Sequence, residues 1–234
     1  YRKVVEETPS SSLAPRALLN MAQIFISHSQ KDKDLRDFFS NAFAGTKVKA
    51  IFEEFEKILR GQVTSEHIKK DIENSKAIFV VLRQNVQDIP HTRDWVIWET
   101  GVAKNRDIWV FEPYSQFGRI SVVTPYLKHY VIFDTSDDWL GYIRRIIESY
   151  DDSNVLQTLL LTGGVGALLA EKDKISGAVL GTLLGLAISD KSKGRPTGIG
   201  VICSECSSSY NIHIPQGINV FRCPVCNVHL KIRV

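Results

Sequence analysis

Cysteine is absent from the first 202 residues of this 234-residue chain, and all four cysteines lie between positions 203 and 226. This distribution is unlike the scattered disulfide framework of small secreted proteins, and it predicts a local site in a reducing, cytoplasmic compartment. Residues 1–20 also lack an apolar run followed by a small-residue cleavage site, so we expect no signal peptide there. The single methionine, Met21, predicts a natural start at that position, with residues 1–21 as sequence added for expression or a loose tail. A short helix after Pro15 is the alternative.

A strong charge of one sign is missing as well. The net charge is +3, and the composition, with 44% hydrophobic and 24% charged residues, is that of a globular protein. Residues 191–234 hold six Lys or Arg and one acid, Glu205, whereas residues 1–154 carry a net charge of −1. A near-neutral main body argues against a large nucleic-acid footprint, so no nucleic-acid partner is expected. The phosphate-binding loop, the dinucleotide Gly-x-Gly-x-x-Gly and the Gly-x-Ser-x-Gly elbow are absent, which argues against NTPase, hydride-transfer and α/β-hydrolase chemistry.

Short apolar runs alternate with amphipathic stretches over residues 22–150. The predicted strands are 23–27, 48–52, 77–82, 108–111 and 130–133, and the predicted helices are 32–44, 64–74, 92–104 and 137–150. This alternation predicts an α/β fold, a flavodoxin-like, doubly wound parallel sheet of five strands. If the strand order is 2-1-3-4-5, ligands bind at the carboxyl ends of the first and third strands, where the order reverses.

Residues 151–190 are different, with two strongly apolar runs that carry glycines. Gly177, Gly181 and Gly185 recur at intervals of four in the second run. Such a repeat is typical of close helix packing, although each run is shorter than the ~20 residues that span a bilayer. The segment predicts a glycine-zipper-like helical hairpin. Shallow membrane insertion, self-association in water and folding back on its own chain are the three alternatives.

After a linker at 191–200, residues 201–234 contain two Cys-x-x-Cys pairs. Cys203 and Cys206 are separated by sixteen residues from Cys223 and Cys226. This spacing is typical of a structural zinc ribbon, in which four thiolates complete a tetrahedral shell. A redox pair or two disulfides are the alternatives. With an independent ribbon, we expect a chelator to unfold residues 200–234 and leave the α/β body standing.

Three stretches within residues 22–150 resemble, in order and spacing, the signature boxes of Toll/interleukin receptor (TIR) domains. They are Ile24–Ser29 followed by Lys31-Asp32, the run from Gly61 to Leu82, and Asp94–Glu99. Two features depart from the family pattern: Asp94 and Val96 replace its usual Ser and Cys, and the loop 53–61 lacks its Pro-Gly. The missing Pro-Gly argues against adaptor-type contacts through that loop more than it argues against catalysis. The resemblance implies a TIR fold.

The resemblance also implies an activity, that of the prokaryotic TIR enzymes that cleave NAD in immune signalling. They release nicotinamide and form ADP-ribose or a cyclic ADP-ribose isomer. Glu99 then holds the catalytic role, because a carboxylate stabilises the positive charge that develops on the ribose carbon. The residues implied in substrate binding are Phe25, Ser27, His28, Lys31, Phe52, Gly61, Asp94 and Trp95. Taken without the resemblance, Trp95 and Trp98 are typical core residues and Glu99 a solvated one.

Two other functions stay open at this point. A non-catalytic TIR scaffold would recruit other TIR domains through TIR–TIR contacts. A membrane-associated effector would act through the hairpin. For the enzyme we expect NAD as substrate, structural zinc, and a homo-oligomer assembled through the TIR domain and the hairpin.

Overall fold

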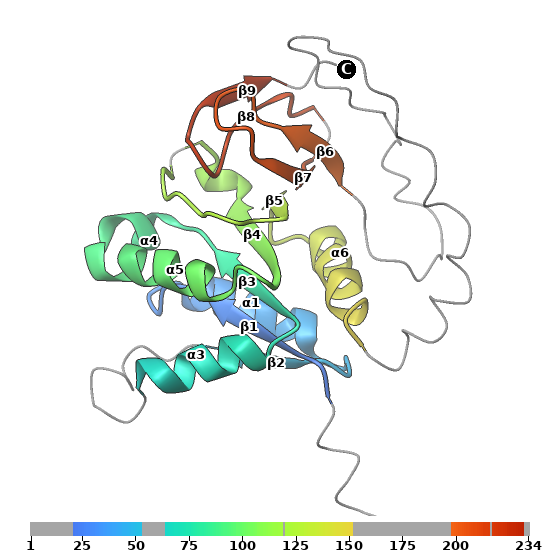
Figure 1. The fold of residues 1–234 in the computed structure, drawn as a ribbon. Helices are drawn as coiled ribbons and strands as arrows, with labels where there is room; N and C mark the ends of the chain where they lie inside the picture. Colours follow the sequence, from blue (N-terminus) through green and yellow to red (C-terminus); the bar gives the residue numbers. More distant parts are fainter. Residues whose placement is uncertain (1–20, 53–63, 119, 152–197, 216, 232–234) are drawn as a thin grey trace, which may run out of the picture.

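The computed structural model describes residues 21–52, 64–118, 120–151, 198–215 and 217–231. Its centre is a seven-stranded, mostly parallel sheet with the order β2-β1-β3-β4-β5-β7-β6 (Figure 1). The strands of this sheet are β1 (Gln23–Ser27), β2 (Lys49–Phe52), β3 (Ala77–Val81), β4 (Asp107–Pro113), β5 (His129–Phe133), β6 (Ile199–Ile202) and β7 (Ser209–His213). The helices are α1 (Lys33–Phe43), α3 (Ser65–Asn74), α4 (Gln84–Asp88), α5 (Pro90–Val102), the 3-10 turn η2 (Tyr114–Gln116) and α6 (Asp137–Glu148). The predicted mixed α/β class is confirmed.

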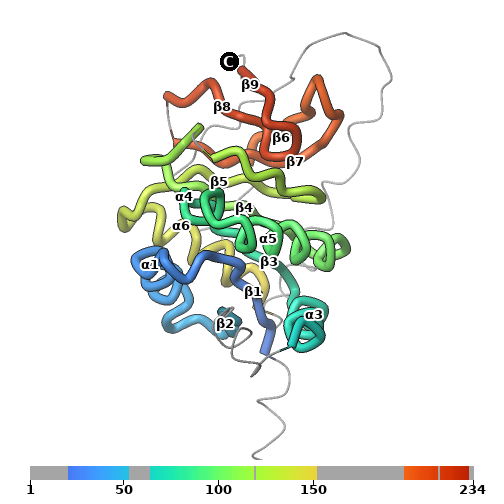
Figure 2. Tube along the Cα trace, turned by 90° about the vertical axis from the view of Figure 1, so that its left-hand side faces the viewer, coloured from blue at the N-terminus to red at the C-terminus, as the bar shows by residue number. Residues whose placement is uncertain are grey.

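The central strands are buried on both faces. All five residues of β3 and all five of β5 are buried, as expected for parallel strands covered by helices on both sides. Figure 2 shows α1 and α6 on one side of the sheet and α3 and α5 on the other. Each helix buries the apolar stripe that the 3.6-residue period puts on one side, such as Ile143, Ile146 and Ile147 of α6.

Two apolar clusters result, one on each face of the sheet. The aromatic face, toward α1 and α6, contains Phe39, Phe79, Trp109, Phe111 and Phe133 among its buried residues. The second face, toward α3 and α5, is largely aliphatic, with Ile72, Ile78, Val80, Val96 and Val110. Residues of β1 alternate between the clusters, so Ile24 and Ile26 lie in the first and Phe25 in the second.

The sheet has seven strands, so the prediction of five is corrected. The two additional strands come from the cysteine-rich end of the chain: β7 pairs in parallel with β5, and β6 pairs antiparallel with β7. The physical reason is that β5 would otherwise be an open edge, which β7 covers with the apolar side chains of Tyr210 and Ile212. The remaining strands, β8 (Val220–Arg222) and β9 (His229–Lys231), form a separate antiparallel pair.

Several predicted features fall outside the described residues. They are the N-terminal tail, the loop that contains Gly61, the glycine-rich hairpin, and most of the linker before the cysteines. Within the described ranges, no helix is long and apolar enough to cross a membrane.

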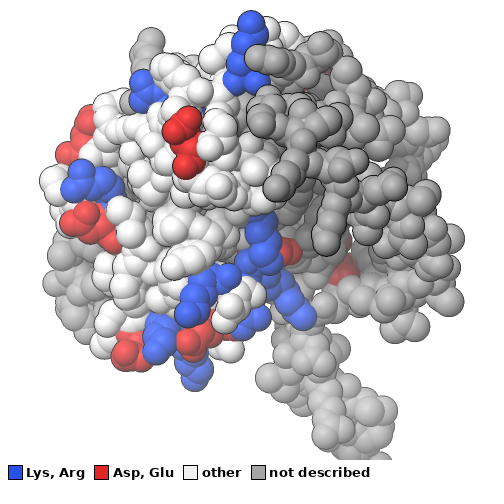
Figure 3. All heavy atoms as spheres, turned by 45° about the horizontal axis from the view of Figure 1, so that its top comes forward, with Lys and Arg blue, Asp and Glu red and all other residues white. Residues whose placement is uncertain are grey.

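Charged side chains are mixed on the face that Figure 3 shows. Lys and Arg lie close to Asp and Glu in several places, and the described part of that face presents no extended field of one sign. A pairwise example on the molecule is Lys128, whose Nζ lies 2.8 Å from Oδ1 of Asp107.

Candidate functional site

A pocket of about 110 Å³ opens at the carboxyl end of β1. One wall is the loop that follows β1, and the other is the segment that leads into α5 and its first turns. The lining residues are His28, Ser29, Gln30, Lys31, Ile89, His91, Thr92, Trp95 and Val96. Because β1 lies between β2 and β3 in the sheet, the pocket is at the point where strand order reverses, the usual ligand position in doubly wound sheets.

Glu99 lies one helical turn beyond Trp95 on α5, and its side chain is fully buried. Its Oε2 accepts a hydrogen bond from the hydroxyl of Ser27, the last residue of β1. Proline at the first position of α5, Pro90, suits a helix start and helps to fix the direction of this helix across the end of β1. The pair therefore places a carboxylate next to two lining residues, since Ser27 precedes His28 and Glu99 lies one turn after Trp95, although Glu99 itself is not among the lining residues.

His28 forms part of the wall and is almost fully buried. Burial lowers the pKa of His28 to about 4, so its imidazole is neutral at pH 7. The ring meets Phe52 edge to face with centroids 5.7 Å apart, and the guanidinium of Arg36 lies 5.7 Å from the centre of the Phe52 ring. Among the described residues, Nδ1 of His28 has no hydrogen-bond partner. A neutral ring nitrogen in a pocket wall is suited to a hydrogen bond with a ligand.

A buried carboxylate holds the loop of the first wall in place. Asp32 accepts a hydrogen bond at Oδ1 from Nδ2 of Asn85 at 2.6 Å, and Arg83 lies 3.6 Å from the same oxygen. Burial raises the pKa of Asp32, and these two partners oppose the rise. The backbone N–H of Asp32 donates to the carbonyl of Ser29 at 3.0 Å, which closes the loop. The loop after β1 is thus tied to the segment after β3.

Trp95 and Trp98 pack against each other with ring centroids 4.7 Å apart and an angle of 31° between their planes. Both are half-buried against the aliphatic cluster, as expected of core residues on a helix. Trp95 additionally lines the pocket. The same tryptophan therefore serves packing and forms an aromatic surface at the site.

The structure brings together five of the nine residues implied for the active site. His28, Lys31 and Trp95 line the pocket, and Ser27 binds Glu99. Phe52 joins them indirectly through His28.

The other implied residues lie elsewhere. Phe25 is a buried core residue of the aliphatic cluster, and Asp94 is exposed beside Arg93 and does not line the pocket. Gly61 lies outside the described residues.

Sequence reasoning did not select the six other lining residues, which are Ser29, Gln30, Ile89, His91, Thr92 and Val96. The available signal was their place in the segments that follow the first and third strands, which here include the first turns of α5. Ligands in this type of sheet bind at those segments.

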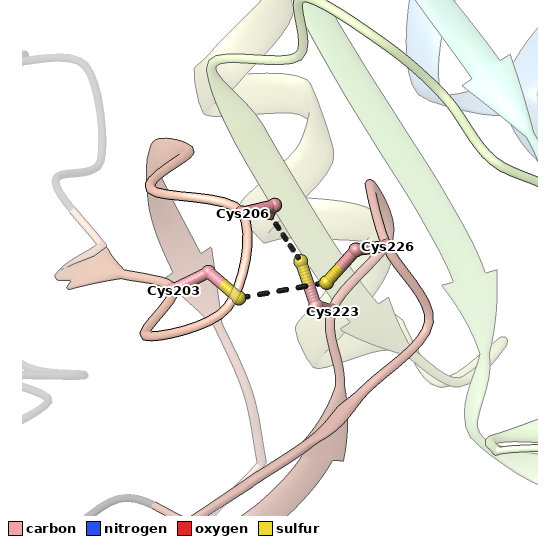
Figure 4. Close-up of side chains that lie close together, drawn as sticks. All are labelled: Cys203, Cys206, Cys223 and Cys226. Carbon is pink, nitrogen blue, oxygen red and sulfur yellow. Dashed lines mark hydrogen bonds between the residues drawn. The ribbon is translucent and has the colours of Figure 1, made fainter.

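The four cysteine sulfurs form a second candidate site (Figure 4). The Sγ atoms all lie within 4.8 Å of one another, with Cys203 and Cys226 at 3.6 Å and Cys206 and Cys223 at 3.8 Å. Zinc–sulfur bonds of about 2.3 Å in a tetrahedron require sulfur atoms about 3.8 Å apart, whereas a disulfide requires about 2.05 Å. The described thiols therefore fit a tetrahedral metal shell, and all four are free of disulfides.

The two Cys-x-x-Cys turns have the same backbone shape. In the first turn the N–H of Ser207 donates to the carbonyl of Cys203 at 3.0 Å, and in the second the N–H of Asn227 donates to that of Cys223 at 2.8 Å. Ser207 and Asn227 both adopt left-handed backbone angles, with φ of 57° and 67°. Burial alone would raise the pKa of Cys206, but hydrogen bonds, first those from Ser208, lower it to about 6. A low pKa favours the thiolate at Cys206, the form that binds a metal, whereas burial raises the pKa of Cys223 and of Cys226 in the absence of a metal.

Comparisons of the chain with family models, with curated proteins and with solved structures give no match.

Proposed function

We propose that this chain is a TIR-type NAD nucleosidase or cyclase, which cleaves the bond between nicotinamide and ribose. The observation that carries the proposal is the buried Ser27–Glu99 pair, which adjoins residues that line a pocket at the reversal point of the sheet. Burying a carboxyl group requires compensating polar contacts, such as the one from Ser27, so this pair is more than apolar packing. The resemblance of residues 22–150 to TIR domains supports the same assignment.

The reaction makes a specific demand on this site. Nicotinamide leaves from a pyridinium as a neutral base, so it needs no proton, while positive charge develops on the ribose carbon. A carboxylate close to that carbon stabilises the charge electrostatically, and it is most effective where water is excluded. Glu99 has this role in the proposal, and Ser27 holds its carboxylate in one orientation.

The walls would hold the remainder of the dinucleotide. Trp95 offers a ring face on which nicotinamide can stack, and neutral His28 offers a ring nitrogen for a hydrogen bond. Lys31 is exposed at the rim and supplies positive charge for the phosphates. Since Glu99 does not line the pocket as it stands, ligand binding has to open a path to its carboxylate.

The four cysteines would hold a structural zinc ion, and their sulfur positions support this part of the proposal. In the proposed assembly, protomers associate through the TIR domain and the glycine-rich hairpin in the cytoplasm, with or without membrane contact of the hairpin. The product would act as a messenger or deplete NAD in an immune response.

The decisive experiment is chromatography of the products formed from NAD. We expect nicotinamide release by the unaltered chain and a loss of at least about 100-fold in Glu99→Gln, because one preorganised electrostatic group contributes about that much or more to catalysis. Glu148→Gln, at an exposed glutamate of α6, is the matched control and should leave the rate unchanged. ADP-ribose among the products indicates attack by water, and an isomer without added water indicates cyclisation.

The principal alternative is the non-catalytic scaffold. A well-folded, self-associated protein that releases no nicotinamide would contradict the enzyme and favour the scaffold. Equal rates for Glu99→Gln and the unaltered chain would contradict the role of Glu99.

A further inference from the structure

The cysteine-rich end of the chain, residues 198–215 and 217–231, is packed into the body of the protein; we refer to it as the tail lobe. Cys203, Tyr210, Phe221 and Cys223 belong to the same buried cluster as residues of the central strands and of α3 and α5. Figures 1 and 2 both show the tail lobe above β4 and β5. Two of the four cysteine ligands are therefore members of the core that also supports the pocket.

The junction between the lobe and the sheet is specific. Ile212 of β7 pairs with Tyr130 of β5, and behind them Nδ1 of His129 lies 3.3 Å from Nε2 of His213. The hydroxyl of Tyr142 on α6 contacts the other ring nitrogen of His213. A side chain at Gly198 would meet the carbonyl of Ile212 at 2.6 Å, so the chain enters β6 through a position that only glycine fits.

The connection between β4 and β5 rests on the second cysteine turn. The carbonyl of Pro224, the residue after Cys223, accepts hydrogen bonds from the N–H of Thr124 at 2.9 Å and from its hydroxyl at 3.3 Å. Thr124 is fully buried, and Val122 and Leu127 beside it belong to the aliphatic cluster. The position of this connection consequently depends on the shape of the turn that carries Cys223.

The same connection reaches the pocket. Oε1 of Gln87 on α4 accepts hydrogen bonds from the N–H and the hydroxyl of Ser121 at 2.7 and 3.1 Å. Oε1 of Gln116 accepts one from the N–H of Gln84 at 2.8 Å. Helix α4 ends at Asp88, directly before the pocket wall that begins at Ile89. A continuous set of contacts thus joins the cysteine cluster to the wall.

We propose that metal binding by the four cysteines sets the position of the pocket wall at residues 89–92, through the β4–β5 connection and α4. The bistable element is the tail lobe: cysteine turns of this kind fold with their metal and lose their fold without it. Without the metal, Thr124 loses the carbonyl of Pro224 as its acceptor, and the aliphatic cluster loses the tail-lobe residues that cover it. The β4–β5 connection then no longer holds α4 in position. This contact path replaces the expectation that a chelator would leave the α/β body unaffected, and it does not rest on NAD cleavage.

Hydrogen–deuterium exchange of the full chain, with zinc and after its removal by a chelator, tests the proposal. We expect one zinc per chain, and on its removal an increase of at least about tenfold in exchange over residues 114–128 and 84–92 as well as in the tail lobe. Helix α1, on the opposite face of the sheet, is the internal reference and should keep its protection. An increase confined to the tail lobe would overturn the proposal, as would equal loss of protection in α1 or the absence of bound metal.

A double variant isolates the path. Gln87→Ala with Gln116→Ala removes these two acceptors that join the connection to α4, and because both side chains are only half-buried and outside the apolar clusters, the fold should remain intact. In this variant, zinc removal should still raise exchange over 114–128, but the zinc-dependent increase over 84–92 should fall at least about threefold. Lys70→Ala, at an exposed position of α3, is the matched control and should respond like the unaltered chain. An unchanged response of 84–92 in the double variant would show that this path does not carry the effect.

Because exchange needs no substrate, the result is separate from that of the NAD experiment. If the chain releases nicotinamide, zinc removal should lower the rate in the unaltered chain. If it releases none, the exchange pattern still decides whether the metal sets the wall.

Discussion

The two faces of the sheet differ in what they bury. The face toward α1 and α6 is dominated by aromatic rings, among which Phe39 meets Phe111 at 5.2 Å and Phe79 meets Phe111 at 4.8 Å between centroids. The opposite face is largely aliphatic and also carries two buried acids: Glu99, which is bonded to Ser27, and Glu112, which is bonded to Tyr130 of the same cluster. Large apolar side chains stabilise a fold, whereas buried carboxylates reduce stability unless they are satisfied. The aromatic face thus contributes mainly apolar stabilisation, whereas the aliphatic face also accommodates these two buried acids.

The largest effect is expected on the aromatic face. Phe39→Ala should lower the free energy of unfolding by about 3–5 kcal/mol, because it opens a cavity among rings that cannot close around it. Denaturant unfolding measures this loss. Ile97→Ala, at a side chain of α5 that is 39% exposed, is the control and should change stability by less than about 0.5 kcal/mol. Equal losses in the two variants would contradict the contrast between the faces.

A pH-dependent effect of intermediate size is expected at Glu112. Burial raises the pKa of this carboxyl to about 7, against hydrogen bonds from the hydroxyl of Tyr130 and the N–H of Gly118. The folded state therefore holds its proton more firmly than the unfolded state, whose value is 4.5. This contribution is fully present below pH 4.5 and is lost as the pH rises through 7.

Glu112→Gln should remove that loss, because the amide never ionises. Relative to the unaltered chain, the variant should gain on the order of 2–3 kcal/mol of stability between pH 4.5 and pH 8, seen in denaturant unfolding over this range. Asp134→Asn, at an exposed acid after β5, is the control and should show no such trend. A constant difference between Glu112→Gln and the unaltered chain across the range would show that Glu112 is ionised in the fold throughout.

Much of the sheet was predictable because its strands are encoded locally. The predicted strand at residues 23–27 is confirmed at both ends, since a short apolar run bounded by polar residues is typical of a buried strand. Helix α4 was missed, because five residues with a single buried side chain, Val86, carry no periodic signal. The pairing of β7 with β5 was also missed, because it joins segments about 80 residues apart and depends on packing that no local pattern records.

The candidate site was only partly predictable for the same reason. The spacing of the four cysteines predicted a shared site, and the structure brings their sulfur atoms together. Glu99 was selected by a family resemblance, and nothing in its neighbours along the chain indicated that Ser27, 72 positions earlier, would be its partner. Pocket residues such as His91 and Thr92 lie in the first turn of α5, whose position in the fold is set by tertiary contacts.

The smallest effect, and the most specific one, is expected at the Ser27–Glu99 pair. Ser27→Ala removes the donor from a fully buried carboxylate, so unfolding free energy should fall by about 1–3 kcal/mol, whereas Ser27→Thr, which keeps the hydroxyl, should lose less. In a Glu99→Gln background, Ser27→Ala should lower the free energy of unfolding by measurably less than in the unaltered chain. The reason is that losing this hydrogen-bond donor destabilises a buried amide less than a buried carboxylate. A double-mutant cycle by denaturant unfolding measures the coupling. If the free-energy changes of the two single variants simply add up in the double variant, Ser27 does not stabilise Glu99. The buried acid on the aliphatic face would then be independent of the serine.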